Sequence, residues 1–189
     1  MNVQLRNLLV LLLLALPFSP ALADDYSDTI KVFQDAGESG QFFKKSYGYA
    51  VFPTIGKGGI GIGGAYGSGQ VYANGVHVGD TSMTQITIGW QLGGQAYSQI
   101  IFFQDKRAFD EFTGGNFEFG AQASAVAITA GASAQAGTTG ATAGASGNQK
   151  HAKTAAQYNK GVVVFTVAKG GLMYEASIGG QKFSYKRKQ

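Results

Sequence analysis

A glycine-rich stretch, residues 46–72, constrains the fold of this chain more than any other feature. In it, glycine alternates with bulky apolar or aromatic residues: SYGYAVFPTIGKGGIGIGGAYGSGQVY. A period of two is typical of a β-strand, whose side chains point to opposite faces in turn. A helix is disfavoured, because each interior glycine costs about 1 kcal/mol relative to alanine. We expect extended structure with one bulky face and one nearly bare face, which another backbone or a ligand can approach closely.

Residues 1–23 have the pattern of a secretory signal peptide. Arg6 precedes an apolar run over residues 8–16, and a small-x-small cleavage pattern ends at Ala23. A membrane anchor is the alternative, but the run is shorter than the ~20 residues that a spanning helix needs. We therefore expect a single mature domain over residues 24–189, either periplasmic or secreted, with a peripheral position on a membrane left open.

Composition excludes several classes of function. The chain has no cysteine, which rules out disulfides, thiol catalysis and thiolate metal sites. Its formal net charge of +4 falls to +3 without Arg6, and the basic residues are scattered, so a nucleic-acid partner is not expected. The basic residues that close the chain are typical of a solvated, frayed terminus, the alternative being a functional tail: Lys182, Lys186, Arg187 and Lys188.

Two helical segments are expected. The first begins near Asp24, with Tyr26, Ile30 and Phe33 on one face, and is followed by the aromatic pair at 42–43. These apolar groups either pack on the core or lie on a membrane. The second helix spans 105–112, with Asp105 as its N-cap.

The rest of the chain predicts β-structure. A hairpin is expected around residues 67–69, although Asn74-Gly75 is itself a strong turn signal. An Ala/Gly/Ser/Thr-rich run near 131–153 predicts a flexible loop. Together these features predict an α+β domain: an N-terminal helix and a short helical insertion on a curled antiparallel β-sheet or small barrel of about eight strands. The expected strands are 47–52, 59–66, 70–78, 84–92, 95–103, 117–130, 161–168, 172–178 and 181–185.

Motifs for enzymatic chemistry are weak. The string GIGIGG at 59–64 matches the dinucleotide-binding pattern, but no helix pattern follows its last glycine. His77 and His151 are isolated from other metal ligands, and there is no nucleophile-elbow motif. We expect a protein that is not an enzyme and has no cofactor or metal, with a hydrolase site assembled in space as the weakest alternative.

Several sequence blocks, in order, resemble the SYLF-domain family of bacterial exported proteins and eukaryotic actin-patch regulators. They are YGYAVFP at 47–53, IGKGG at 55–59, GGAYGSG at 63–69, GWQLGGQA at 89–96, FEFGA at 117–121 and FTVAKGGLM at 165–173. The resemblance implies binding of anionic phospholipids. It also implies actin binding in some members, but an exported chain does not normally meet actin, so actin is not expected as a native partner.

Two lysines in the matching blocks lie beside paired glycines. These are Lys57 with Gly58-Gly59, and Lys169 with Gly170-Gly171. Glycine exposes backbone N–H groups and the ammonium adds a charge, so each position suits a phosphate, although each is equally typical of an ordinary turn.

Lys44 and Lys45 offer a different membrane contact, because they follow the aromatic pair at 42–43. The leading hypothesis is an exported module that binds anionic phospholipid or membrane surfaces. A small outer-membrane β-barrel or a structural envelope protein is the alternative.

Overall fold

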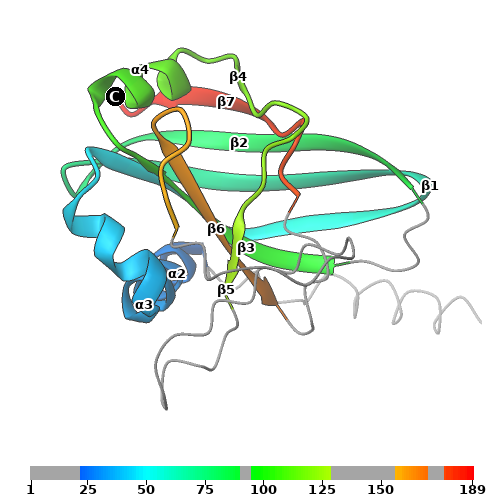
Figure 1. Cartoon of the computed structure of the whole chain (residues 1–189), viewed down its shortest axis with the longest axis horizontal. Helices are drawn as coiled ribbons and strands as arrows, with labels where there is room; N and C mark the ends of the chain where they lie inside the picture. Colours follow the sequence, from blue (N-terminus) through cyan, green and yellow to red (C-terminus); the bar gives the residue numbers. More distant parts are fainter. Residues whose placement is uncertain (1–21, 90–94, 129–155, 170–176) are drawn as a thin grey trace, which may run out of the picture.

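Seven strands form one curled sheet in a computed structural model that describes residues 22–89, 95–128, 156–169 and 177–189 (Figure 1). Their order across the sheet is β4-β7-β2-β1-β3-β6-β5. Neighbours pair antiparallel, as expected, except that β5 is parallel to β6. The predicted α+β class is confirmed. The strands are β1 (Gly48–Ala73), β2 (Val76–Gly89), β3 (Gln95–Phe103), β4 (Phe117–Glu118), β5 (Val126–Ile128), β6 (Val162–Lys169) and β7 (Lys182–Arg187).

Strand β1 doubles back on itself. Its first part, 48–57, pairs with β3, whereas its second part, 61–73, pairs with β2. The two parts lie side by side, because a Cβ on Gly69 would meet the Val51 carbonyl and the Phe52 ring, and the Asn74 amide donates to the Tyr47 carbonyl at 3.2 Å. Figure 1 shows the ribbon running to one end of the sheet and back. The seven labelled strands therefore make eight strand segments.

The expected turn at residues 67–69 is wrong, and the alternative turn at Asn74-Gly75 is the one that forms. Gly67 and Gly69 lie within the second arm of β1, opposite Met83 and Thr81 of β2. The chain reverses instead at Asn74 and Gly75, whose φ angles of 50° and 80° suit a tight hairpin.

Both faces of the central strands are buried, because apolar side chains fill both. One core cluster, which we call the inner core, contains Phe52, Ile55, Tyr97 and Phe103, and the outer core contains the alternate residues such as Phe102. The apolar runs at 100–103 in β3 and 162–165 in β6 are consistent with this double burial, since both faces of those segments pack against apolar side chains.

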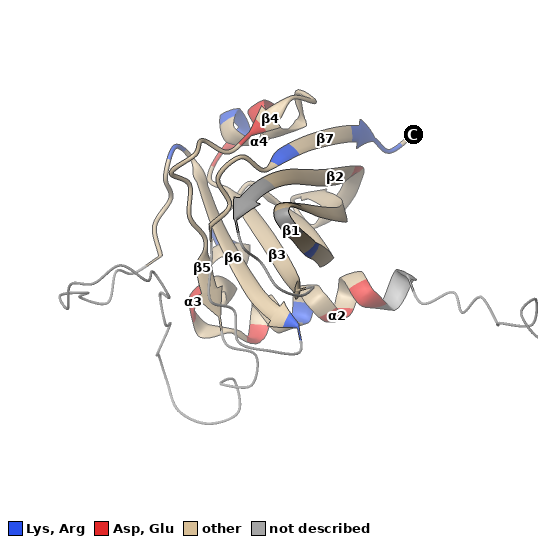
Figure 2. Ribbon diagram, turned by 90° about the vertical axis from the view of Figure 1, so that its right-hand side faces the viewer, with Lys and Arg blue, Asp and Glu red and all other residues tan. Residues whose placement is uncertain are grey.

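The N-terminal helices cover the outer core (Figure 2). They are α2 (Leu22–Asp35), α3 (Gly37–Gly40) and the 3-10 turn η1 (Gln41–Lys44). The predicted helix face is confirmed, because Phe33 is fully buried in the outer core and Tyr26 and Ile30 pack against it. None of the described helices combines the length and apolar character that crossing a bilayer requires.

The second predicted helix is confirmed as α4 (Lys106–Thr113). The Asp105 side chain accepts a hydrogen bond from the Ala108 amide at 2.9 Å and so caps the helix. Phe112 is buried in the inner core, with its ring centroid 4.8 Å from that of Phe103. Helix α4 therefore closes part of the concave side of the sheet.

Other predicted segments are shorter or lie outside the described residues. Within its described residues, 117–128, the strand expected over 117–130 forms only β4 and β5, because the chain between them turns at Gly120, whose carbonyl accepts from the Ala123 amide at 2.9 Å. Residues 1–21, the loop near 131–153 and most of the strand expected at 172–178 are not among the described residues.

Candidate functional site

Three large apolar side chains are exposed on one face of the β1–β2 hairpin. Ile62 is 74% exposed, Tyr66 is 58% exposed and Ile86 is 80% exposed. In the register, Ile86 stands opposite Gly64, which separates Ile62 from Tyr66 along β1. Residues two apart and directly opposed share a face of a sheet, so the three side chains form one group, the apolar patch.

On β1, the residues on the face opposite the apolar patch are small and buried. Ala65, Gly67 and Gly69 alternate with the exposed positions and are buried. A Cβ on Gly67 would lie 2.6 Å from the Ile55 side chain, so the first arm of β1 occupies that space. The bare glycine face expected from the sequence is thus filled by the protein itself, and the bulky face is the one left open.

Lys57 lies at the same end of the sheet as the apolar patch. It is opposite Gln95 of β3, next to the Ile55–Tyr97 pair, and therefore lies on the inner-core face. Gly58 has open space around it, and Gly59 has a φ of 147° at the point where the two arms of β1 meet. The predicted residues 57–59 thus lead into the reversal of the chain.

Lys169 lies at this end too, but on the opposite face from Lys57. It is opposite Ala96, and its Nζ donates to Thr54 Oγ1 at 2.8 Å and lies 3.7 Å from Asp25 Oδ1 of α2. The structure therefore does not bring the two predicted lysines together into one site. Gly170 and Gly171 fall outside the described residues.

Lys44 and Lys45 are exposed at the end of η1, and the preceding aromatic pair packs on the outer core, Phe42 as a buried residue and Phe43 as a partly buried one. Phe42 is buried, with ring centroids 5.7 Å from Phe102 and 5.4 Å from Phe165. Of the two uses expected for this segment, the structure shows packing on the core.

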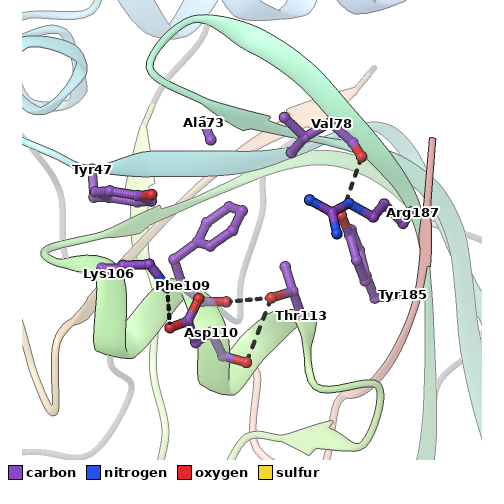
Figure 3. Close-up of a pocket in the computed structure, with 9 residues that line it drawn as sticks. All are labelled: Tyr47, Ala73, Val78, Lys106, Phe109, Asp110, Thr113, Tyr185 and Arg187. Carbon is purple, nitrogen blue, oxygen red and sulfur yellow. Dashed lines mark hydrogen bonds and ion pairs between the residues drawn. The ribbon is translucent and has the colours of Figure 1, made fainter. Parts of the chain in front are cut away.

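A cavity of about 620 Å³ lies at the other end of the β1–β2 hairpin, between α4 and β7 (Figure 3). This cavity was not predicted from the sequence, although the basic residues near the C-terminus include Arg187, which lines it. The expected frayed terminus is wrong for Lys182, Lys186 and Arg187, which all lie in β7. The lining residues are Tyr47, Ala73, Val78, Lys106, Phe109, Asp110, Thr113, Tyr185 and Arg187.

Histidine and acidic residues form no metal cluster in the described part of the chain. No group of three His, Cys, Asp or Glu side chains there could hold a metal ion. His77 Nε2 instead contacts Asp80 Oδ1 at 3.0 Å and the Gly79 carbonyl at 3.1 Å.

Comparison with known proteins gives two matches. The Ysc84 family model, described as "Las17-binding protein actin regulator", matches residues 84–189, which is more than half of the chain. Beta cell expansion factor A of Aeromonas veronii is 29% identical over 156 residues, covering 82% of this chain and 51% of that protein. The chain therefore spans about half the length of this curated relative.

Proposed function

This chain belongs to the Ysc84 family, the SYLF-domain family that its sequence resembles, and from that premise we propose that it is an exported, non-enzymatic module that binds anionic phospholipid at membrane surfaces. The observation that carries the proposal is the exposure of the apolar patch. Exposed apolar groups gathered on one face mark interaction sites more often than isolated ones do. Tyrosine adds a ring whose apolar body and polar tip suit the boundary between lipid and water.

The charge near the apolar patch favours an anionic bilayer as the partner. Lys57 and Lys169 lie on the two faces of the sheet at the same end, so cations flank the hairpin. Apolar insertion combined with cationic attraction is how interfacial segments bind membranes.

The free energies expected for the two kinds of contact indicate that the apolar patch supplies most of the affinity for the membrane. Full burial of an isoleucine side chain contributes about 1.5–3 kcal/mol. A lysine near an anionic surface contributes about 1 kcal/mol. The Asp25 carboxylate beside Lys169 reduces that lysine's share further, because it already balances part of the charge. Loss of either isoleucine should therefore weaken binding more than loss of either lysine.

Co-sedimentation with vesicles tests the proposal. We expect Ile62→Ser and Ile86→Ser each to weaken binding to vesicles containing phosphatidylglycerol by about tenfold or more. The matched control is Val76→Ser, which removes another exposed apolar side chain, 63% exposed, from the far end of the same hairpin and should change binding by less than about twofold.

The lysine variants test the charge. Lys57→Ala should reduce the preference for anionic over neutral phosphatidylcholine vesicles by about fivefold, corresponding to about 1 kcal/mol, and Lys169→Ala by less. Equal recovery of the unmodified protein from neutral and anionic vesicles would contradict the charge-based part. Unchanged binding by both isoleucine variants would contradict the role of the apolar patch.

The location is part of the proposal. Cleavage after Ala23 would release a periplasmic or secreted protein that meets membrane lipid but not cytosolic actin, so we propose lipid and not actin as the native partner. Intact-mass measurement of protein recovered from an osmotic-shock or culture fraction should give a chain that begins at Asp24. A chain retaining residues 1–23 would contradict export by this route.

A further inference from the structure

We propose that the cavity between α4 and β7 is a second binding site, which takes a small amphipathic molecule with one oxyanion group and an apolar body. The proposal is independent of membrane binding, since the apolar patch and the cavity lie at opposite ends of the β1–β2 hairpin. Ile62 and Ala73, at those two ends, are separated along β1 by roughly 35 Å.

Arg187 is the group that would bind the anion. Its side chain lies on the same face of β7 as Tyr185, two residues earlier, and Gly79 opposite it carries no side chain. Among the described residues, no carboxylate lies within ion-pair distance of Arg187, whereas Lys106 and Arg107 pair with Asp110 and Glu111 at 2.6 and 2.8 Å. The guanidinium can therefore offer its paired N–H donors to a carboxylate or phosphate group.

One part of the cavity wall is apolar and aromatic. The rings of Tyr47 and Phe109 lie with centroids 5.3 Å apart, and Figure 3 shows Phe109 pointing into the space between Tyr47 and Val78. Ala73 adds a small apolar surface from the end of β1. A volume of about 620 Å³ falls in the range of about 300–1,000 Å³ that is usual for small-molecule sites.

Four of the other polar side chains in the cavity wall already have partners: Lys106, Asp110, Thr113 and Tyr185. The Tyr185 hydroxyl donates to the Val78 carbonyl at 3.1 Å, and the Thr113 hydroxyl donates to the Phe109 carbonyl at 2.9 Å. The Asp110 carboxylate accepts from Lys106 Nζ and would oppose a second negative charge nearby. The cavity therefore selects for one anionic group joined to an apolar body.

Titration of the purified protein without vesicles tests this site, with backbone amide NMR shifts as the readout. The probes are octanoate and octyl phosphate, which carry both parts of the ligand, octanol, which lacks the charge, and acetate and inorganic phosphate, which lack the chain. We expect the two amphipathic probes to bind at least about tenfold more tightly than the others and to shift the amides of Ala73, Thr113 and Arg187. The tighter of the two amphipathic probes identifies whether the anionic group is a carboxylate or a phosphate.

Variants distinguish binding in the cavity from non-specific attraction of the anionic probes to positive charge. Arg187→Gln should weaken octanoate and octyl phosphate binding by about tenfold or more, while Lys186→Gln, the same charge change on the opposite face of β7, should change it by less than about twofold. Ala73→Leu should block the cavity without altering charge. The far-UV circular dichroism of each variant checks that it folds.

Two sets of results would overturn the proposal. The first is equal affinity for octanol and octanoate. The second is equal loss in Arg187→Gln and Lys186→Gln, or unchanged binding in both Arg187→Gln and Ala73→Leu. Ile86→Ser should leave probe binding unchanged, so failure of the membrane proposal would not affect this one.

Discussion

Two buried glutamines join opposite parts of the sheet inside the inner core. Gln99 of β3 and Gln181, just before β7, are both fully buried. Each amide nitrogen donates to the other side-chain oxygen, at 2.9 and 3.1 Å, and Gln181 Nε2 also lies 3.1 Å from the Tyr97 hydroxyl. Since β1 and β2 separate β3 from β7 in the sheet, this pair spans the concave interior rather than a strand ladder.

Replacing one glutamine should leave the other without its partner. We expect Gln181→Leu to lower the free energy of unfolding by about 2 kcal/mol, because a buried amide then loses its hydrogen bonds. Urea unfolding measures this, and the double variant Gln99→Leu/Gln181→Leu should be less destabilised than the sum of the single variants. Simple additivity of the two single variants would contradict the pairing.

At the scale of elements, the doubled strand β1 depends on glycines that allow its arms to approach. The Phe52 ring and the Val51 carbonyl of the other arm occupy the space that a side chain on Gly69 would need. Gly64, by contrast, would place a Cβ 3.4 Å from the Gln85 carbonyl, an ordinary contact on the exposed face. The same residue type therefore serves different purposes a few positions apart.

These two glycines give a matched pair of substitutions. Gly69→Ala should lower the free energy of unfolding by about 1–3 kcal/mol, because the methyl group overlaps buried atoms that have little room to move. Gly64→Ala should be close to neutral or slightly stabilising, since alanine loses less backbone freedom on folding. Thermal unfolding of both variants checks the difference, and equal losses would show that the arms do not approach as described.

Local signals made some elements predictable from the sequence. Helix α4 could be predicted because its Asp105 cap and apolar stripe are contiguous, and β3 because β-branched and aromatic residues dominate it and its last four residues, 100–103, are all apolar. Gly67 and Gly69 were misassigned to a turn because their role depends on contacts with Phe52 and Ile55, which lie well before them in the sequence.

The candidate site was predictable only in part, for a similar reason. The sequence places Lys57 and Lys169 beside glycines, but it does not reveal the faces on which they lie. The face of Lys57 depends on the register shift between Phe52 and Ile55 in β1, and the face of Lys169 depends on the pairing of β6 with β3. The apolar patch was missed because alternation alone does not say which face of a strand is buried.

At the scale of the whole molecule, buried and partly buried tyrosines link stability to alkaline pH. Burial raises the pKa of Tyr49 to about 12 from the ordinary value of 10, and its ring stacks on Tyr72 with centroids 4.9 Å apart. The pKa is raised, chiefly by burial, for tyrosines in several parts of the fold: Tyr26, Tyr72, Tyr97, Tyr158 and Tyr185.

Raising the pH should therefore unfold the protein in a definite range. Below pH 10 the tyrosines are protonated in both folded and unfolded chains, so their stabilising contribution is complete; between pH 10 and 12 the unfolded chain ionises first and stability falls. We expect tyrosinate absorbance to appear together with loss of circular dichroism, and Tyr49→Phe to reduce the pH dependence. Full ionisation near pH 10 with the fold intact would contradict this.

The position of β7 beside β2 has a consequence for how the chain is completed. The Ser82 and Ser184 hydroxyls that meet across these strands at 2.7 Å are separated by 102 residues. Strands β1, β2 and β3 are all synthesised before β7. A chain that has not yet placed β7 therefore exposes the unpaired backbone edge of β2. That edge is open to β7 from another copy. Truncation before Lys182 removes β7 from every copy, so it should favour pairing between exposed β2 edges and aggregation, which light scattering measures.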